Sequence, residues 1–332
     1  MDGALLLDLI SFHLKNNYLG QFLIVHYVPT SIDLKSAPKK LLKAIELLFI
    51  KTHVEETHIE IEKSYGYRTW PSTDCIKIQT RLFELLHSAN DEPSVKIVNV
   101  KKQLTYLMQW HFLDELHRDG DKPAQIEDNF HGKHLMWFKY GLLHRENDEP
   151  AHIKHPYEKT WYKNGNKHRD GDKPAYVNEC LSERCKVWYR HGLIHRDNDL
   201  PAEIDESGVK WYNYGLLHRD GDKPSYIQYS STSFTYMWHK NGLRHRDYDR
   251  PAVIIGPNYQ EWYVNGNIHR DYDRPALVTA DYSQWYINGC IRRINNLPTR
   301  VFSNGRKVWQ HHDKKYNTIT IIRDVYDNDV IN

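Results

Sequence analysis

Apolar and polar positions recur together along most of the chain as one repeated motif. The motif reads Trp-(Tyr/Phe)-x-x-Gly-x-x-His-Arg-x-x-Asp-x-Pro-(Ala/Ser/Thr)-x-(Ile/Val), and it is plainest from Trp161 to Val177. Recurrence with a period of about 20–50 residues is typical of repeat proteins, in which stacked units share one continuous core. Trp309 opens an incomplete ninth copy. The lead tryptophans of the other copies are Trp110, Trp137, Trp161, Trp188, Trp211, Trp238, Trp262 and Trp285.

The glycine of the motif predicts a tight β-hairpin after each tryptophan. In four copies Asn precedes it, and Asn-Gly suits a type I′ turn because both central residues of that turn need positive φ. If Asn-Gly forms the turn in the clearest copy, Tyr162 faces Lys167 and Trp161 faces His168. We therefore predict a Trp–His cross-strand pair on one face and Tyr on the other. The Asn-Gly pairs are Asn164-Gly165, Asn241-Gly242, Asn265-Gly266 and Asn288-Gly289.

The end of the motif predicts a turn followed by a buried strand. Proline has a fixed φ and no backbone donor, so Asp-x-Pro marks a break in the strand ladder. The position three residues after Pro is β-branched in every copy, which predicts a strand that enters the core. These positions are Ile126, Ile153, Val177, Ile204, Ile227, Ile254, Val278 and Val301.

The connection from each Pro to the next Trp varies in length, whereas the motif does not. It spans 14, 11, 14, 10, 14, 11, 10 and 11 positions in turn. This alternation predicts that every second hairpin is extended. Variable loops on a constant scaffold are where specific binding residues are expected. We therefore assign partner specificity to the long connections at 125–136, 176–187 and 226–237.

The pattern predicts a mainly β fold, an elongated array of stacked antiparallel β-hairpins with a small, partly helical N-terminal domain. Residues 1–62 form that domain, 63–109 hold degenerate repeats, 110–310 form the array and 311–332 cap it. Segments 4–15 and 38–51 have helical spacing of apolar residues. Segments 57–62 and 316–325 are expected to be strands, and 86–94 is a faded copy of the motif.

Composition narrows the class of protein. Net charge is +2, with 45 basic and 43 acidic residues, and each motif balances its own charges, which argues against nucleic acid as a partner. The four cysteines do not recur with the motif, which favours a reducing compartment and not a disulfide framework. The apolar start lacks a basic leader and a cleavage site. We expect a soluble, cytoplasmic protein.

The recurring histidines and acids are the candidate chemical groups. His-Arg-Asp resembles a protein-kinase catalytic loop, but six copies cannot all be catalytic, and no glycine-rich loop or Asp-Phe-Gly follows. We expect no enzymatic activity and no cofactor. The histidines are His117, His144, His168, His195, His218, His245 and His269, and the acids before Pro are Asp121, Asp148, Asp172, Asp199, Asp222, Asp249 and Asp273.

A structural role is the favoured interpretation of these groups, with metal binding as the alternative. Asp pairs suit Ca²⁺, yet the further oxygens and closing Glu of an EF-hand loop are missing. We expect the second Asp to cap the turn before Pro, and the first to pair with Arg of the same or an adjacent copy. Histidine is expected to stack on Trp; a metal ladder and a pH-sensitive stack are the other interpretations. In the eighth copy Arg292, Ile294 and Asn296 replace the set together.

The unit Trp-Tyr-x-Asn-Gly-x-x-His-Arg-x-x-Asp-x-Pro-Ala, over residues 80–310, resembles the variant MORN-type repeat of large DNA viruses, phages and bacteria. The resemblance implies a row of hairpins that acts as a non-enzymatic scaffold and contacts proteins or lipids. His-Arg and Asp-x-Pro replace the glycine-rich pattern of ordinary MORN units. The leader from Leu5 to Val25 resembles an F-box, although Leu6 stands where Pro is usual and His26-Tyr27 where Cys-Arg/Lys-x-Trp is usual.

These patterns lead to one main functional hypothesis and two alternatives. The main hypothesis is a scaffold that binds a protein partner along the array. One alternative is a substrate adaptor of a ubiquitin ligase, with residues 1–62 as the F-box-like part. The other is a scaffold for peripheral membrane attachment.

Overall fold

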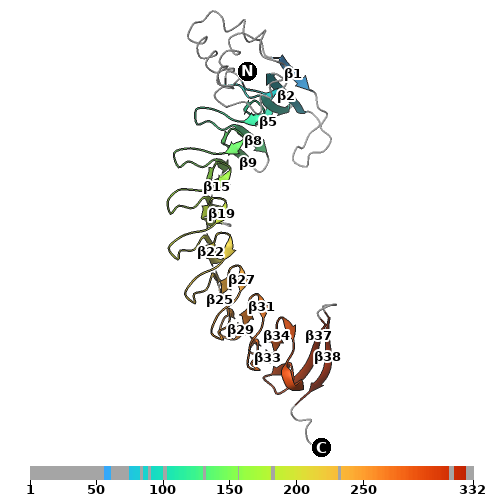
Figure 1. Cartoon of the computed structure of the whole chain (residues 1–332). Helices are drawn as coiled ribbons and strands as arrows, with labels where there is room; N and C mark the ends of the chain where they lie inside the picture. The colour runs from blue at the N-terminus through green and yellow to red at the C-terminus, as the bar shows by residue number, and fades with distance from the viewer. Residues whose placement is uncertain are drawn as a thin grey trace, which may run out of the picture. The chain divides into compact units, whose positions relative to one another are not determined.

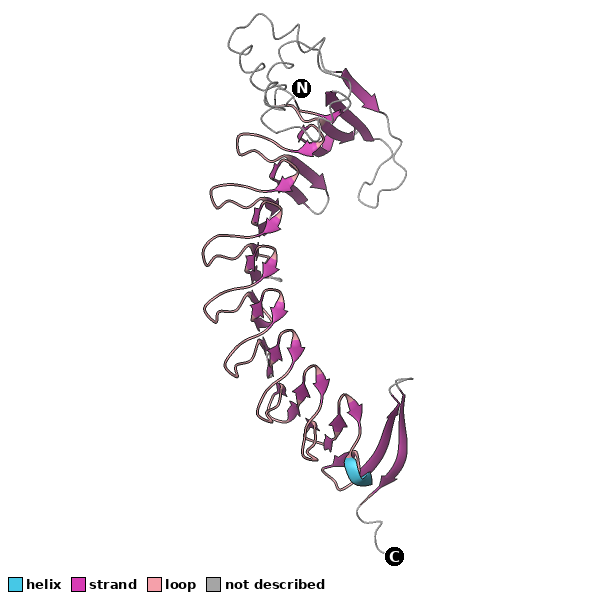
Figure 2. Cartoon of the chain, viewed as in Figure 1, coloured by secondary structure: helices cyan, strands magenta, loops and turns pink. Residues whose placement is uncertain are grey.

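The computed structural model describes residues 56–60, 75–82, 85–88, 91–99, 103–129, 132–155, 157–180, 184–230, 233–313 and 318–326. Strands dominate these residues, and the single helical element among them is the 3₁₀ turn η1 (Ile294–Asn296) (Figure 2). The chain divides into two compact units, residues 1–156 and 157–332. The predicted mainly β array of antiparallel hairpins is confirmed.

Each repeat consists of two hairpins of different size. The larger hairpin runs from Pro to the next Trp and joins a continuous antiparallel sheet; β28 (Val253–Ile255) pairs with β29 (Tyr259–Glu261), which pairs with β32 (Leu277–Val278). The smaller hairpin follows Trp262 and consists of β30 (Tyr263–Val264) and β31 (Asn267–Ile268). The sheet therefore advances by two strands in each repeat, and within the second unit the small hairpins follow one another in single file (Figure 1).

In the first unit the sheet pairs its strands in the order β1, β2, β4, β5, β8, β9 and β12. Their bounds are β1 Glu56–Glu60, β2 Cys75–Leu82, β4 Val95–Asn99, β5 Leu104–Gln109, β8 Gln125–Asn129, β9 Gly132–Met136 and β12 His152–Lys154. The short β3 (Leu85–Leu86) pairs with the end of β2. The small hairpins are β6 (His111–Phe112) with β7 (Glu115–Leu116), and β10 (Phe138–Lys139) with β11 (Leu142–Leu143).

In the second unit the sheet strands pair one after another in chain order. The strands are β13 Glu158–Thr160, β16 Tyr176–Asn178, β17 Cys185–Val187, β20 Glu203–Asp205, β21 Gly208–Lys210, β24 Tyr226–Tyr229, β25 Phe234–Met237, β28, β29, β32, β33 Tyr282–Gln284, β36 Arg300–Phe302, β37 Lys307–Asp313 and β38 Thr318–Val325. The other small hairpins are β14 Tyr162–Lys163 with β15 Asn166–Lys167, β18 Tyr189–Arg190 with β19 Leu193–Ile194, β22 Tyr212–Asn213 with β23 Leu216–Leu217, β26 His239–Lys240 with β27 Leu243–Arg244, and β34 Tyr286–Ile287 with β35 Cys290–Ile291.

The predicted turn and its register are confirmed. Asn164 and Gly165 both have positive φ, at 50° and 80°, as a type I′ turn requires. Tyr162 lies opposite Lys167, as expected from the sequence. The backbone N–H of His168 also donates to the carbonyl oxygen of Trp161 over 3.1 Å. The turn chemistry of the motif thus sets the geometry of the small hairpin.

The most deeply buried position of the motif lies one residue after Pro, and not three residues after it as the β-branched pattern predicted. The residue after Pro is 0% exposed in seven copies, whereas among the β-branched positions only Val177 is buried and the others are half-buried. In each of these copies the Trp N–H donates to the carbonyl of that residue, for example Trp238 to Ala252 over 2.8 Å. The two backbones are therefore bonded directly, and the fully buried residue at this position is alanine or serine in all seven copies. The seven are Ala124, Ala151, Ala175, Ala202, Ser225, Ala252 and Ala276.

The prediction that long connections form extended hairpins is confirmed for two of the three. The hairpin β8–β9 stays paired out to Asn129 and Gly132, and β24–β25 stays paired out to Tyr229 and Phe234. In the connection at 176–187 it is wrong, because β16 and β17 pair over three residues and the additional residues lie in the loop between them.

Of the other sequence predictions, the structure tests only some. The C-terminal strand is confirmed as β38. The helices at 4–15 and 38–51 and the F-box-like leader lie outside the described residues. Within the described part of the chain, no helix has the length and apolar character needed to cross a membrane.

Candidate functional site

One set of contacts joins neighbouring repeats within each unit. The carboxylate of Asp249 accepts two hydrogen bonds from Arg270, over 2.7 Å from Nε and 3.1 Å from Nη2. The Arg270 guanidinium lies 3.8 Å above the ring of Trp262, and the Trp262 Nε1–H donates to the backbone oxygen of Asp249 over 3.1 Å. We call this closed circuit of Asp, Arg and Trp the inter-repeat clamp.

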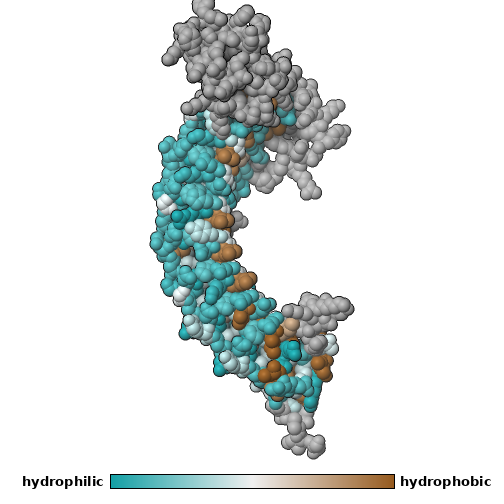
Figure 3. Space-filling view, in the orientation of Figure 1, coloured by the Kyte–Doolittle hydropathy of each residue, from teal (hydrophilic) through white to brown (hydrophobic). Residues whose placement is uncertain are grey.

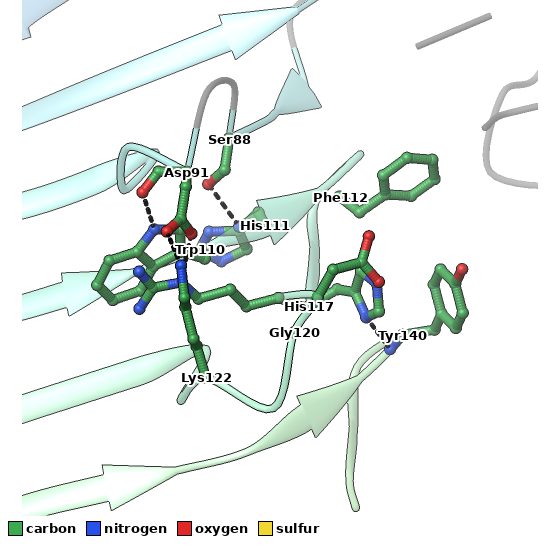
Figure 4. A pocket seen from close by; sticks show the side chains of 11 residues that line it. Ser88, Asp91, Trp110, His111, Phe112, His117, Gly120, Lys122 and Tyr140 are labelled. Atoms are coloured by element: carbon green, nitrogen blue, oxygen red, sulfur yellow. Dashed lines mark hydrogen bonds and ion pairs between the residues drawn. The ribbon is translucent and has the colours of Figure 1, made fainter. Parts of the chain in front are cut away.

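The inter-repeat clamp recurs in both units with nearly constant geometry. Its first copy, Asp91–Arg118–Trp110, lines a polar crevice (Figure 4). There Arg118 bonds Asp91 through Nε, and Lys122 forms an ion pair with the same carboxylate. Bidentate Arg–carboxylate bonds and Arg–aromatic stacking are both strong, specific contacts. The other complete clamps are Asp121–Arg145–Trp137, Asp199–Arg219–Trp211, Asp222–Arg246–Trp238 and Asp273–Arg293–Trp285. Asp172 and Arg196 form the same bidentate bond.

The clamp keeps its carboxylates ionised. Hydrogen bonds from Arg219 and Lys223 lower the pKa of Asp199 to about 2, and those from Arg118 and Lys122 do the same for Asp91. The hydrogen bond from Arg270 likewise lowers the pKa of Asp249. A carboxylate that is bound by two cations and stays charged at neutral pH is a poor general base. The recurring acid therefore serves as an anchor for arginine.

Most of the recurring histidines join two repeats, since Nδ1 accepts a backbone N–H of the next repeat while Nε2 bonds an acid of the histidine's own repeat. Nδ1 of His245 accepts the backbone N–H of Asn265 in the next repeat over 3.1 Å, so Nε2 carries the proton and donates to Asp247 over 2.8 Å. His168, His195, His218 and His269 are bonded in the same way. In the first unit His117 accepts the N–H of Tyr140, and His144 has the Glu146 carboxylate 3.0 Å from its Nε2.

Some histidines also stack on an aromatic residue of the next turn. His117 lies 4.2 Å from Tyr140, and His195 lies 4.1 Å from Tyr214, with nearly parallel rings. Tyr140 and Tyr214 occupy the Asn position of the turn with positive φ, at 50° and 43°. A bulky residue is disfavoured in that backbone region. Ring stacking with the preceding repeat offsets that cost.

Two predictions about this set are wrong. The side chain that covers Trp is Arg and not His, because Trp lies between the sheet hairpin and the small hairpin, where strand alternation does not continue. The acid that binds Arg of the next repeat is the second and not the first as predicted, and the first acid binds the His two residues before it. Apart from Trp285, which is half-buried, the lead tryptophans are buried as expected of a scaffold.

The apolar and aromatic side chains that reach the surface belong to particular copies. Leu193, Leu216 and Leu243 follow the turn glycine in three consecutive repeats and are half-exposed. Figure 3 shows these small hairpins as apolar spots on a mostly hydrophilic face. Tyr229 and Phe234 are exposed at the end of β24–β25. From the sequence, partner specificity was assigned to the long connections, and these exposed leucines were not identified as candidate contact residues. The recurrence of Leu directly after the turn Gly could have pointed to them.

Two buried serines lie beside histidines: the hydroxyls of Ser94 and Ser225 are each 2.8 Å from a ring nitrogen, Nδ1 of His111 and of His239, and both serines are 0% exposed. Cys180, Cys185 and Cys290 are free thiols, and burial raises the pKa of Cys185 to about 11, which keeps it protonated. Among the described residues, no three His, Cys, Asp or Glu side chains converge as metal ligands. No protein-family model matches the sequence, and no curated protein is similar to it.

Proposed function

We propose that the protein is a non-enzymatic scaffold that binds a protein partner along its hairpin array. One observation carries the proposal: the polar groups present in every copy are bonded to one another between repeats, while exposed aromatic and apolar groups occur in particular copies. Polar groups that are bonded to one another in this way join the repeats and are not free to act as catalytic groups. The resemblance of the motif to the variant MORN-type repeat supports the same function.

The end of the β24–β25 hairpin is the part of the long connections best suited to contact a partner. The rings of Tyr229 and Phe234 lie 6.1 Å apart in a T-shaped arrangement, and both side chains are exposed. The hydroxyl of Ser230 donates to the carbonyl of Ser233 over 2.8 Å, which joins the two sides of the hairpin next to the aromatic residues. Aromatic residues on a rigid support are typical of protein interfaces.

Replacing the two aromatics by serine is expected to weaken partner capture about tenfold, the effect of losing roughly 1.4 kcal/mol of binding free energy. The measurement is affinity capture from the native host with quantitative mass spectrometry, using Tyr229→Ser with Phe234→Ser. Glu206→Ser is the matched control, since Glu206 is an exposed, non-aromatic residue of the β20–β21 turn, whose Ser207 carbonyl accepts the backbone N–H of Tyr229. Equal capture by the wild type and the aromatic variant would remove this hairpin from the binding surface.

A further inference from the structure

Two consecutive repeats place a tyrosine where the backbone favours glycine. Tyr248 and Tyr272 have φ of 65° and 60°, and their side chains are 83% and 84% exposed. The equivalent positions in other copies hold Gly or Asn, which adopt this conformation readily. A strained and almost fully exposed ring contributes little to folding, so its position points to a ligand. The equivalent residues are Gly120, Asn147, Gly171, Asn198 and Gly221.

The same two loops also carry arginine in place of the lysine of other copies. Arg250 and Arg274 stand where Lys122, Lys173 and Lys223 stand elsewhere. Their guanidinium groups lie 5.9 Å and 5.8 Å from the tyrosine rings of their own loops, with half of each side chain exposed. Tyrosine and arginine are the residues enriched where binding energy concentrates. We call residues 247–250 and 271–274 the tyrosine loops.

The inter-repeat clamp fixes the distance between the two tyrosine loops. Asp249, next to Tyr248, binds both Arg270 and Arg274, which stand two residues before and after Tyr272. One repeat of the sheet separates the loops, which is two strands, or about 10 Å at the usual strand spacing. The backbones of the two loops are therefore about 10 Å apart, and each tyrosine ring lies at nearly the same distance from the arginine of its own loop.

This spacing matches one ligand conformation. A polyproline II helix rises about 3.1 Å per residue with three residues per turn, so every third side chain lies on one face about 9 Å apart. A β-strand repeats its face about every 7 Å and fits the rings less well. Proline rings pack on aromatic side chains, and the carbonyls of a polyproline II helix remain free to accept hydrogen bonds from arginine.

We propose that the tyrosine loops bind a proline-rich segment in the polyproline II conformation, with one proline on each of Tyr248 and Tyr272 and the segment's carbonyls accepting from Arg250 and Arg274. The proposal deepens the scaffold function proposed above and rests on it, because it names the chemical class of partner that the tyrosine loops would bind. Asp247 and Asp271 of these loops pair with Lys240 and His269, and Arg250 and Arg274 pair with Asp222 and Asp249. Because the charges are paired, the loops fit a neutral segment better than a strongly charged one.

The test uses the full chain and a fluorescein-labelled peptide with proline at every third position and alanine between. We expect saturable binding by fluorescence anisotropy, and weaker binding of a peptide of equal length with proline at every second position. Tyr248→Gly with Tyr272→Gly is expected to weaken binding about tenfold. Its unfolding temperature is expected to equal or exceed that of the wild type, because glycine relieves the positive-φ strain.

Two control variants separate this site from its surroundings. Asn147→Gly with Asn198→Gly changes the equivalent positions of other loops and should leave peptide binding unchanged. Tyr229→Ser with Phe234→Ser should also leave it unchanged. Absence of saturable binding, or equal affinity in the Tyr→Gly variant, would overturn the polyproline assignment. The scaffold function would then still be judged separately by partner capture through β24–β25.

Discussion

Replacing Trp238 by alanine is expected to lower the free energy of unfolding by about 3–5 kcal/mol. The indole is 8% exposed and lies 3.7 Å from the Arg246 guanidinium. Its Nε1–H donates to the backbone oxygen of Asp222 over 3.2 Å. The substitution leaves a cavity and removes both the surface on which Arg246 stacks and a bond to the preceding repeat, so three contributions are lost together.

The measurement is denaturant unfolding followed by circular dichroism, with Trp309→Ala as the matched control. Trp309 is half-exposed, and the nearest guanidinium above its ring, that of Arg323, is 5.0 Å away. It also lies outside the complete clamps. A clearly smaller loss is therefore expected for Trp309→Ala. Equal losses of unfolding free energy in Trp238→Ala and Trp309→Ala would show that the clamp contributes no stability beyond the burial of the indole.

The second large effect is expected from enlarging the small buried residue that follows Pro. Ala252→Leu is expected to destabilise the protein by about 1–3 kcal/mol, because a packed site must shift to admit three more carbons. Ala252 is 0% exposed, and its carbonyl and N–H bond to Trp238 and Glu261 over 2.8 Å and 2.7 Å. Its backbone is therefore held from two sides and cannot move away.

The control for this substitution is Ala280→Leu, at an exposed alanine of a nearby loop. Both variants add the same side chain, and only the site differs. Thermal unfolding is expected to show a lower midpoint for Ala252→Leu and little change for Ala280→Leu. A tolerated leucine at Ala252 would mean that the Trp and post-proline backbones can separate without loss of stability.

Local features of the sequence predicted the fold well. The Asn164-Gly165 turn and its strand register follow from backbone conformational preferences that act over a few residues. The core position was mispredicted for a physical reason. A β-branched residue three positions after Pro indicates a strand, yet burial is decided by which backbones touch, and that contact joins Trp238 to Ala252 across 14 residues. Periodicity within one strand does not reveal it.

The sequence predicted that Asp pairs with Arg of the same or an adjacent copy, but it assigned this to the wrong acid and did not include Trp. The ends of the array carried a signal for the correct pairing. The faded first copy keeps Asp91 but has Ser88 in the Arg position, and the eighth copy keeps Arg293 but has Asn296 in the Asp position. The first copy thus has the acid but no Arg, and the eighth copy has the Arg but no acid. This pattern indicates that the acid of one copy pairs with the Arg of the next copy. The Arg118–Asp91 bond shows this pairing.

The coupling between Asp249 and Arg270 is the most direct test of the clamp as the element that joins repeats. A double-mutant cycle with Asp249→Ala and Arg270→Ala, measured by denaturant unfolding, is expected to give an interaction energy of about 0.5–3 kcal/mol. The same cycle with Asp222→Ala and Arg270→Ala is expected to give an interaction energy near zero, because Asp222 binds Arg246 and Arg270 binds Asp249. Additive effects of Asp249→Ala and Arg270→Ala would contradict the account.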